Sequence, residues 1–490
     1  MAAPAVDLHT IGTLGVRRLT VDSRAVRPGD TFVAYPGESR DGRDYIAQAI
    51  ANGAASVLWD ADDYAWNARW RVPNLGIPHL RRQAGVIASE VYGKPGAKLW
   101  VVGVTGTNGK TSCSHWIAQS LTRVRRKCGV IGTLGSGFPG RLDAHANTTP
   151  DAVTLHGHLR NQARAGARAV CMEVSSHGLE QDRVSGIEFD VALLTNLTRD
   201  HLDYHGTMRR YRAAKARLFR WPTLRYAVLN LDDAFGRELA QMRAQVRRHG
   251  ETLGYGFRAV PARLRVPRVE GRNLRMDLNG LSFDVTSPWG RATVRSAMIG
   301  GFNAANLLGS LTTLLASNVG LEQAVSALGK VLPVPGRMER YGGGRMPLVI
   351  VDYAHTPDAL EKVLLSLRQV AGARARLVCV FGCGGDRDRG KRPMMGAVAG
   401  RLADRIVLTS DNPRTEDPAA IIADITEGIR GAHERIADRQ LAIRSAIAQA
   451  RRGDVVLVAG KGHENYQEAG GVRRRHSDAA VVRAALGSTR

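Results

Sequence analysis

Cysteine is scarce in this chain, with five in 490 residues. The number is odd and the positions are scattered, so they do not indicate a disulfide framework. Two of the five lie close together, but no second pair or histidine cluster accompanies them, which disfavours a metal site. We therefore expect reduced, buried thiols at Cys113, Cys128, Cys171, Cys379 and Cys383.

Long apolar stretches are also missing. No segment approaches the roughly 18 unbroken apolar residues of a membrane span, and residues 1–20 lack the basic start and apolar core of a signal peptide. We expect a cytoplasmic protein with no membrane partner. The chain has no low-complexity stretch or short repeat, and 490 residues exceed what one core can hold, so several domains are expected.

Acidic residues are outnumbered. The chain has 69 Lys and Arg against 45 Asp and Glu, a net charge of +24, which raises the hypothesis of a nucleic-acid partner. Against that hypothesis, the basic residues are spread along the chain, and short clusters such as 123–127 and 473–475 lack interleaved aromatics. We expect no nucleic-acid partner, and note that a cleft receiving several phosphates would benefit from the same charge.

The most informative stretch is LWVVGVTGTNGKT, residues 99–111. Residues 99–104 are apolar and β-branched and predict a buried strand, while residues 112–122 predict a helix. A glycine-rich turn between a strand and a helix points backbone N–H groups at a phosphate. Lys110 adds a cation for the phosphates and Thr111 a hydroxyl for their magnesium. The usual spacing of such loops fits only if counting starts at Gly103, so a structural turn is the alternative.

Two further strands of the middle region end in polar residues. Residues 169–172 lead into Glu173, and residues 191–194 lead into a stretch that reaches His201. Because the carboxyl ends of parallel strands share one edge of a sheet, we expect Glu173 and His201 to reach a magnesium ion near Lys110. Downstream, residues 211–219 predict a helix that carries Lys215.

A second predicted helix of the middle region spans residues 300–315. Its start carries Asn303 and Asn306, which lie one helical turn apart on one face.

The flanking regions predict α/β domains. Residues 1–97 contain predicted strands at 20–24, 31–34 and 55–59 and a helix at 45–52. Residues 336–490 alternate strands at 348–351, 377–381, 405–408 and 454–459 with helices such as 359–370 and 421–432, which is typical of a doubly wound parallel sheet. Each strand of this last region ends in Gly, Asp, Arg or His residues, which we expect to line a cleft facing the nucleotide domain.

Ten motifs in this order resemble the Mur ligases over nearly the whole chain: TGTNGKT, EVSSHGL, TNLTRDHLDYHG, YRAAK, FNAANLL, PGRME, DYAHTPDAL, GCGGDRDRGKRP, DNPRTEDP and AGKGHE. The resemblance implies an α/β protein of three domains: a small UDP-precursor-binding domain (1–97), a central P-loop ATPase (98–335) and a C-terminal Rossmann-like domain that binds the amino acid (336–490).

The resemblance also implies an activity. ATP phosphorylates the D-glutamate γ-carboxylate of UDP-N-acetylmuramoyl-L-alanyl-D-glutamate, and the amine of meso-diaminopimelate displaces phosphate to form an amide of the peptidoglycan precursor. A carboxylate is a poor electrophile, so phosphorylation supplies the leaving group, and positioning with Mg²⁺ and Lys110 supplies most of the catalysis. The expected partners are these small molecules, and the expected oligomeric state is a monomer.

Residue roles follow from the matching motifs. The implied catalytic residues are Lys110, Glu173, His201 and Lys215. ATP is assigned to Thr107, Asn108, Gly109, Lys110, Thr111, Ser112, Cys113, Asn303, Asn306, Arg337 and Asp352. Magnesium is assigned to Thr111, Glu173, His201 and Lys215, the lysine carrying a carbamate. The precursor is assigned to Val21, Ser23, Glu38, Ser39, Arg40, Asn147, Thr148, Thr149, Ser175, Gln181 and Arg183. Diaminopimelate is assigned to Arg387, Asp411, Asn412, Pro413, Arg414, Gly460 and Glu464.

Two other classes of protein are alternatives to a Mur ligase. A folylpolyglutamate synthetase shares the ATPase and C-terminal architecture but lacks the first domain and leaves residues 411–414 without a role. A basic nucleotide- or nucleic-acid-binding regulator has no need of Lys110, Glu173, His201 and Lys215 together.

Overall fold

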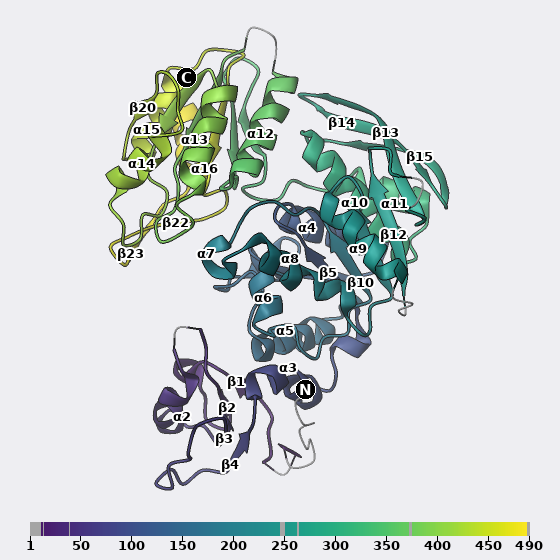
Figure 1. Cartoon of the computed structure of the whole chain (residues 1–490), viewed down its shortest axis with the longest axis vertical. Helices are drawn as coiled ribbons and strands as arrows, with labels where there is room; N and C mark the ends of the chain where they lie inside the picture. The colour runs from purple at the N-terminus through teal and green to yellow at the C-terminus, as the bar shows by residue number, and fades with distance from the viewer. Residues whose placement is uncertain are drawn as a thin grey trace.

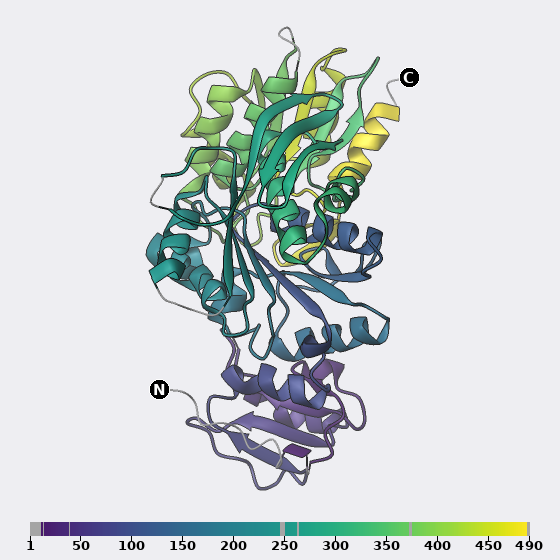
Figure 2. The same cartoon turned by 90° about the vertical axis from the view of Figure 1, so that its right-hand side faces the viewer.

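The computed structural model describes residues 11–12, 14–38, 40–245, 250–261, 264–371 and 375–487. Within these ranges the chain forms three α/β domains, each built around its own main sheet (Figure 1). The N-terminal domain lies at one end of the long axis, and the C-terminal domain lies toward the other, beside the central one (Figure 2). The expected α/β class with three domains is confirmed.

The N-terminal sheet has four parallel strands in chain order. These strands are β1 (Leu19–Thr20), β2 (Thr31–Ala34), β3 (Ser56–Asp60) and β4 (Asn74–Ile77). The helices of this domain are α2 (Ile46–Ala51) and α3 (Leu80–Val91). Helix α3 buries Leu80, Ala84 and Ile87 and packs against a helix of the central domain, so this face joins the two domains.

The prediction of a strand at residues 20–24 is wrong. Only Leu19–Thr20 pairs with β2, and Ser23–Ala25 forms a 3₁₀ turn. The Asp22 carboxylate accepts from the backbone N–H of Arg24 at 3.0 Å, and this local cap competes with an extended conformation.

The central sheet has eleven strands in the order β15-β14-β13-β12-β11-β10-β5-β9-β6-β7-β8. Its parallel centre is β6 (Cys128–Gly132), β9 (Ala169–Glu173), β5 (Trp100–Thr105), β10 (Val191–Leu194), β11 (Tyr226–Asn230) and β12 (Glu251–Gly256). Antiparallel hairpins extend both edges, with β13 (Arg268–Asp277), β14 (Gly280–Ser287) and β15 (Gly290–Ser296) on one side and β7 (Gly135–Phe138) and β8 (Arg141–Asp143) on the other.

Helices cover both faces of this sheet. They are α4 (Lys110–Arg123), α5 (Ala152–Arg164), α6 (Ser176–Glu180), α7 (Leu202–His205), α8 (Met208–Ala216), α9 (Ala234–Gln245), α10 (Gly301–Ala316) and α11 (Leu321–Leu328). Alternate residues of β5 enter opposite cores, Val102 and Val104 on the α4/α10 side and Val101 on the α5 side. The sheet is therefore buried on both faces, as its apolar strands require.

Helix α10 is buried almost throughout its length. Its hydroxyl groups are satisfied locally: Ser310, Thr312 and Thr313 each donate to the carbonyl four residues earlier at 2.8–2.9 Å. Polar residues can therefore occupy this buried helix without leaving a hydrogen-bond donor unpaired. The first turn of the helix lies at the edge of the sheet that carries the phosphate loop.

The C-terminal sheet has the order β16-β17-β21-β18-β19-β20 and is parallel except for β16. Its strands are β16 (Glu339–Gly342), β17 (Leu348–Asp352), β18 (Leu377–Phe381), β19 (Arg405–Leu408), β20 (Glu434–Arg435) and β21 (Val455–Ala459), and β22 (Tyr466–Ala469) and β23 (Val472–Arg475) form a separate hairpin. The helices are α12 (Pro357–Val370), α13 (Lys391–Leu402), α14 (Pro418–Thr426), α15 (Arg439–Ala448) and α16 (Asp478–Gly487).

The helix expected at 421–432 ends six residues early, at Thr426. Glu427 caps the helix and Gly428 follows it in a turn, and glycine is the residue type that most often terminates a helix. The strands at 31–34, 191–194, 377–381 and 405–408 have the predicted bounds.

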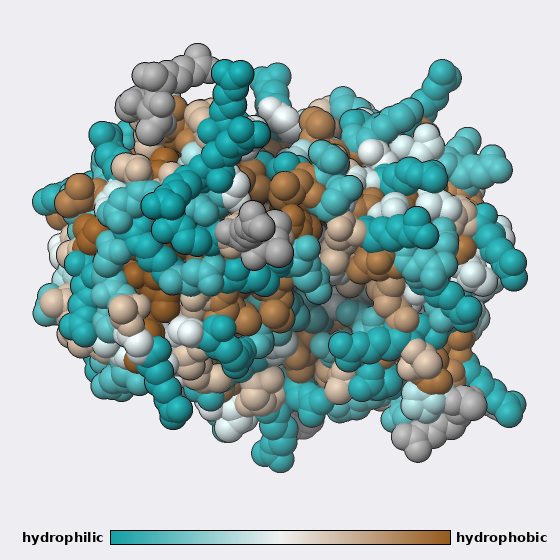
Figure 3. Space-filling model, turned by 90° about the horizontal axis from the view of Figure 1, so that it is seen from above, coloured by the Kyte–Doolittle hydropathy of each residue, from teal (hydrophilic) through white to brown (hydrophobic). Residues whose placement is uncertain are grey.

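The surface and the cysteines match an ordinary globular chain. All five cysteines are free and buried. No helix in the described ranges is both long and apolar enough to cross a membrane. Hydrophilic side chains are spread over the face seen from above and interrupt its apolar areas (Figure 3).

Candidate active site

The phosphate loop connects β5 to α4 at the carboxyl end of the central sheet. Gly109 caps α4 with a left-handed φ of 85°, a conformation that glycine adopts without strain. The Nζ of Lys110 donates to the carbonyls of Gly106 and Thr107, both at 2.9 Å, so the ammonium lies over its own loop. Burial lowers the pKa of Lys110. The start of α4 and this cation together form an anion-binding site.

Glu173 is fully buried at the end of β9 and is held by two threonines. Its Oε2 accepts from Thr111 Oγ1 at 3.0 Å and from Thr133 Oγ1 at 3.1 Å, while its Oε1 accepts from Thr133 N–H at 2.8 Å. A Cβ at Gly132 would lie 2.2 Å from Oε1, so only glycine allows this approach. Two strand ends and the start of α4 thus converge on one carboxylate.

Lys215, from α8, also reaches the loop. Its Nζ donates to the Gly106 carbonyl at 2.8 Å, and the residue is 1% exposed. Burial, together with the nearby charge of Lys110, lowers the pKa of Lys215 well below its usual range. A lysine in this setting gives up its proton to form a nucleophilic amine more readily than an exposed lysine does.

His201 stands at the same edge, with a left-handed backbone (φ 53°). Burial, with the positive charge of Lys110 and Lys215, lowers its pKa, so the imidazole is neutral and can act as a ligand. The His201 ring lies edge-on to the His177 ring, with the two ring centroids 4.8 Å apart. The backbone N–H of His201 donates to Asp200 Oδ1 at 2.9 Å.

A cavity of about 530 Å³ lies beside the loop, between the central and C-terminal domains. Most of the residues assigned to ATP line it: Thr107, Asn108, Gly109, Lys110, Thr111, Ser112, Asn303, Asn306, Arg337 and Asp352. Asn306 Nδ2 donates to Asn303 Oδ1 at 3.3 Å, as expected for residues one turn apart. Cys113 is the exception, because its thiol points into the core and donates to the Asn306 carbonyl at 3.6 Å.

The C-terminal domain contacts this cavity directly. Arg337 Nη2 donates to Thr111 Oγ1 at 3.1 Å, and its guanidinium lies 4.2 Å from the Tyr353 ring centroid. Asn108 Nδ2 donates to Asp358 Oδ2 of α12 at 3.0 Å. The nucleotide site is therefore assembled from two domains.

A larger cavity of about 1320 Å³ adjoins the first. Lys110, Thr133, Thr148, His201 and Tyr353 line both, so the two cavities share a wall. Of the residues assigned to the precursor, Asn147, Thr148, Ser175 and Arg183 line the larger cavity, and of those assigned to diaminopimelate, Arg387, Arg414 and Glu464 do.

Two other precursor residues support this wall from behind. Thr149 is buried and donates to the Glu173 backbone carbonyl at 2.9 Å while accepting from Ser175 N–H at 3.0 Å. Gln181 accepts from Arg183 Nε at 2.9 Å, and Arg183 Nη1 donates to the Thr149 carbonyl at 2.8 Å. These bonds orient the Arg183 guanidinium in the cavity.

The N-terminal residues lie apart from both cavities. Ser23 is buried and donates to Gln48 Oε1 at 2.7 Å, and neither it, Val21 nor the exposed Arg40 is among the lining residues. Glu38 contacts the central domain, since it accepts from the Tyr204 hydroxyl at 3.3 Å. Ser39 lies outside the described residues.

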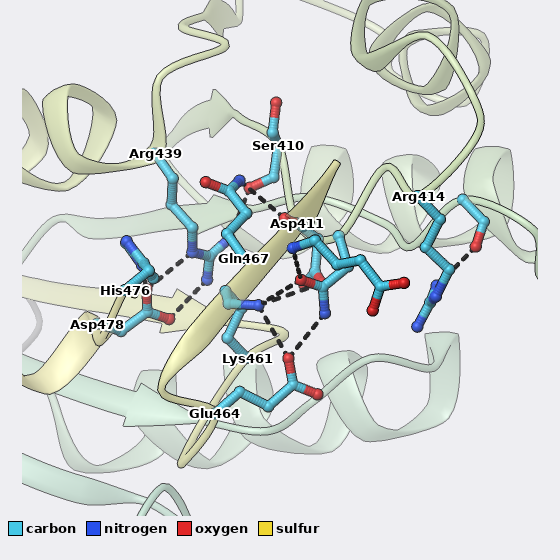
Figure 4. Close-up of polar contacts among 12 residues, drawn as sticks. Ser410, Asp411, Arg414, Arg439, Lys461, Glu464, Gln467, His476 and Asp478 are labelled. Atoms are coloured by element: carbon cyan, nitrogen blue, oxygen red, sulfur yellow. Dashed lines mark hydrogen bonds and ion pairs between the residues drawn. The ribbon is translucent and has the colours of Figure 1, made fainter. Parts of the chain in front are cut away.

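The residues assigned to diaminopimelate divide into those that line the larger cavity and those that lie behind its wall; Figure 4 shows Arg414 and Glu464 of the first group and Asp411 of the second. Arg414 has a left-handed backbone (φ 53°) and donates from Nη1 to the Gly385 carbonyl at 2.6 Å. Glu464 Oε2 accepts from Asn412 Nδ2 and from Lys461 Nζ, both at 2.8 Å. Asp411, Asn412, Pro413 and Gly460 lie behind the cavity wall formed by Arg414 and Glu464.

Several site residues were missed by the sequence analysis. Thr133 follows a short β-branched strand, the same signal that led to Glu173, and could have been found. Asp358 and Lys461 sit within quoted motifs, but their contacts depend on how two loops or domains meet.

The donors present fit magnesium. No group of three or more His, Cys, Asp or Glu side chains that could hold a metal occurs in the described part of the chain. Mg²⁺ is usually held by one or two protein oxygens with water and substrate phosphates completing its shell. A carboxylate of Glu173 3.0 Å from the Thr111 hydroxyl, beside a phosphate loop, matches that chemistry.

A phosphate loop, a buried carboxylate and a second cleft at a domain junction define a nucleotide-dependent enzyme that acts on a further substrate. Three family models match the chain: "Mur ligase family, catalytic domain" at residues 16–92, "Mur ligase middle domain" at 104–314 and "Mur ligase, glutamate ligase domain" at 336–462. The chain belongs to the Mur ligase family.

Within this family the chain is similar to UDP-N-acetylmuramoyl-L-alanyl-D-glutamate--2,6-diaminopimelate ligases. It is 52% identical to that of Chromobacterium violaceum, covering 99% of this chain and 97% of that protein. It is 49% identical to that of Pseudomonas aeruginosa, covering 96% and 95%. A solved structure of an enzyme of the same name matches with a TM-score of 0.68 and 38% identity, covering 97% and 95%.

More distant structures share the fold alone. The MurF ligase of Thermotoga maritima in complex with ADP matches with a TM-score of 0.66 and 18% identity, covering 94% of this chain and 96% of that one. A folylpolyglutamate synthase of Mycobacterium tuberculosis matches with a TM-score of 0.63 and 18% identity but covers only 78% of this chain.

Proposed function

We propose that this chain is an ATP-dependent ligase that adds meso-2,6-diaminopimelate to the D-glutamate γ-carboxyl of UDP-N-acetylmuramoyl-L-alanyl-D-glutamate, a step of peptidoglycan precursor synthesis. Relatives that bear this activity in their names cover nearly the whole chain. The observation that carries the proposal is the shared wall of the two cavities, where Lys110 and His201 border both. Phosphoryl transfer from ATP to a second substrate requires such a junction.

The first chemical step is attack of the γ-carboxylate on the terminal phosphorus of ATP, with loss of ADP. The loop N–H groups at the start of α4 would hold the phosphates, and the Lys110 ammonium lies over the same loop. Charge that builds up on the phosphoryl oxygens is stabilised by these fixed groups, which need no reorganisation during the reaction. Asn303, Asn306, Arg337 and Asp352 are assigned to hold the rest of the nucleotide.

The second step is attack of the amine on the acyl carbon, which breaks the carbon–oxygen bond to phosphate and forms the amide. Arg183, fixed by Gln181 and Thr149, is placed to hold the precursor in the larger cavity. Arg414 and Glu464 border the same cavity and present opposite charges to the amino acid. Holding the two substrates side by side in this way converts a bimolecular reaction into an effectively unimolecular one.

Magnesium, when bound, neutralises phosphate charge and orients the transferred group. Glu173 and Thr111 would hold it at the ATP phosphates. His201 and Lys215, the latter as a carbamate, would serve a second ion on the side of the larger cavity.

We further propose domain boundaries after residues 97 and 335, a monomer, and a cytoplasmic enzyme whose partners are its small-molecule substrates. The boundaries are supported by the three sheets and by family matches that fall within the ranges 1–97, 98–335 and 336–490.

The test is release of phosphate from ATP by the purified protein. Release should require both the UDP-dipeptide precursor and meso-diaminopimelate, and the product should gain the mass of one diaminopimelyl residue. Release that is instead stimulated by DNA, or that proceeds with a folate and glutamate, would contradict the proposal.

A further inference from the structure

A completely buried lysine, which none of the assigned roles includes, lies directly behind the amino-acid end of the larger cavity. Lys461 follows β21 and is 0% exposed. Its Nζ donates to Asn412 Oδ1 at 2.9 Å and to Glu464 Oε2 at 2.8 Å, and Asp411 Oδ1 lies 4.0 Å away (Figure 4). A buried ammonium is costly unless its donors are matched, and here they are matched by two loops.

The contacts of Lys461 join those two loops. Asn412 belongs to the turn after β19, and Glu464 to the turn after β21. Asn412 Nδ2 donates to the same Oε2 of Glu464 at 2.8 Å, and Asn412 Oδ1 also accepts from the backbone N–H of Glu468 at 3.0 Å. The lysine and the asparagine therefore fix Glu464 through one carboxylate oxygen.

The other oxygen of Glu464 is left for a ligand. Glu464 lines the larger cavity, and within the described chain its Oε1 accepts no hydrogen bond. Figure 4 shows this oxygen pointing away from Lys461. An ionised carboxylate that is held by one oxygen presents the second one, with a defined direction, to a cationic group.

The charge balance supports the same conclusion. Asp411 and Glu464 are two carboxylates against the single ammonium of Lys461, so this cluster has one excess negative charge, and Glu464 is its member that lines the cavity. In the neighbouring buried cluster the Asp478 carboxylate is bound by Arg439 at 2.7 Å and 2.8 Å and by His476 Nε2 at 2.7 Å, so its charge is matched without Glu464. The excess charge therefore matches one ammonium group.

We infer that Lys461 is a positioning residue for amino-acid selection: it holds Glu464 so that Oε1 receives the far-end ammonium of the diamino acid while Arg414 receives the carboxylate beside it. This inference rests on the proposed function and adds a residue that never touches the substrate. Lys461 acts on the affinity for the amino acid, because the nucleotide site lies on the other side of the shared wall.

The experiment measures KM for meso-diaminopimelate and for ATP in the full-length protein with Lys461→Met, Glu464→Gln and the double substitution. We expect Lys461→Met to raise KM for diaminopimelate by about 10- to 100-fold, the range for a lost charge-assisted contact, and to leave KM for ATP within about twofold. Because Lys461 acts through Glu464, the double variant should be within about threefold of Glu464→Gln alone. Arg452→Met, which removes an exposed cation of the same domain, is the matched control.

Multiplying effects in the double variant, or equal increases in KM for ATP and diaminopimelate, would show a merely structural role and overturn the inference. An unchanged KM in Lys461→Met would do the same. If Lys461→Met does not fold, as judged by circular dichroism, Lys461→Gln carries the same comparison with a neutral side chain of similar length. Failure of the wild-type protein to ligate diaminopimelate overturns the proposed function instead, so the two failures are distinguishable.

Discussion

Lys110 and Lys215 donate to the same oxygen: their Nζ atoms lie 2.9 Å and 2.8 Å from the Gly106 carbonyl. One lysine comes from the phosphate loop and the other from α8, more than a hundred residues later. Two buried ammonium groups this close disfavour each other, and the pKa of Lys215 is lowered by burial and by Lys110. The pair provides a fixed cation for phosphate next to an amine that can lose its proton.

The first prediction concerns Lys215. A neutral amine can add carbon dioxide to form an anionic carbamate, which would relieve the repulsion from Lys110 and provide oxygens for magnesium. Lys215→Ala should therefore abolish most ligation while leaving the circular dichroism spectrum unchanged, and added short-chain carboxylic acids should restore part of the rate. Lys98→Ala, at an exposed position, is the control. Full activity of Lys215→Ala without any response to added acid would contradict the carbamate.

The second prediction concerns Thr133, which holds Glu173 by two hydrogen bonds. Thr133→Val keeps the backbone bond to Oε1 and removes the hydroxyl bond to Oε2. A hydrogen bond to a charged group contributes about 1.5–3 kcal/mol, so we expect a roughly 10- to 100-fold loss of kcat/KM and a higher magnesium requirement. Magnesium titrations of the steady-state rate measure both. Thr133→Ser keeps the hydroxyl and should recover most of the activity; equal defects in the two variants would argue against this role.

The third prediction is a loss of stability in mild acid. His156 in α5 is fully buried, and burial lowers its pKa from 6.5 to about 4. Between these values the unfolded chain binds a proton at this ring and the folded chain does not. The free energy of unfolding should therefore fall as the pH decreases from about 6.5 to 4, by about 1.4 kcal/mol per pH unit for this histidine.

Urea unfolding at pH 7 and at pH 5 measures the effect. His156→Gln can still donate to the Ser185 carbonyl that His156 Nε2 contacts at 3.0 Å, but it does not titrate. The difference in stability between the two pH values should be smaller in this variant. Burial also lowers the pKa of His115 to about 4, so part of the pH dependence of stability should persist in His156→Gln. An identical pH dependence in wild type and His156→Gln would show that His156 is not involved.

Much of the site could be predicted because it follows from short-range patterns. Buried parallel strands are continuous apolar runs, and the residue that follows each run lies at the ligand edge of the sheet. Glu173, His201 and the phosphate loop were located by this rule, and they line one cavity in the structure.

The remaining contacts arise from the way separate parts of the chain pack. Arg337 and Thr111 are 226 positions apart and meet only because the C-terminal domain packs against the phosphate loop. The partners of Lys461 come from two turns about fifty residues apart in sequence. The hairpin strands β13–β15 were not predicted, because they alternate apolar and polar residues on a half-exposed edge and so contain no continuous apolar run.

The last prediction is the choice of amino acid. Meso-diaminopimelate differs from L-lysine by a carboxylate beside its far-end amine, so a selective site must offer a cation there. The Arg414 guanidinium lines the larger cavity and is oriented by the Gly385 carbonyl, and among the described residues no carboxylate is paired with it. Its planar fork suits a carboxylate, while a role as a helix cap is disfavoured because a helix N-terminus repels positive charge.

With L-lysine bound, Arg414 would lack its carboxylate, and each charge-assisted bond lost costs about 1.5–3 kcal/mol. Two or three such losses give a preference for meso-diaminopimelate on the order of 10⁴ in kcat/KM. Arg414→Ala should raise KM for diaminopimelate and leave KM for ATP nearly unchanged. It should also reduce the preference for diaminopimelate over L-lysine, because L-lysine has no carboxylate to bind the guanidinium at that end. Parallel ligation assays with the two amino acids measure this. Comparable use of both by the wild-type protein would show that Arg414 does not select the substrate.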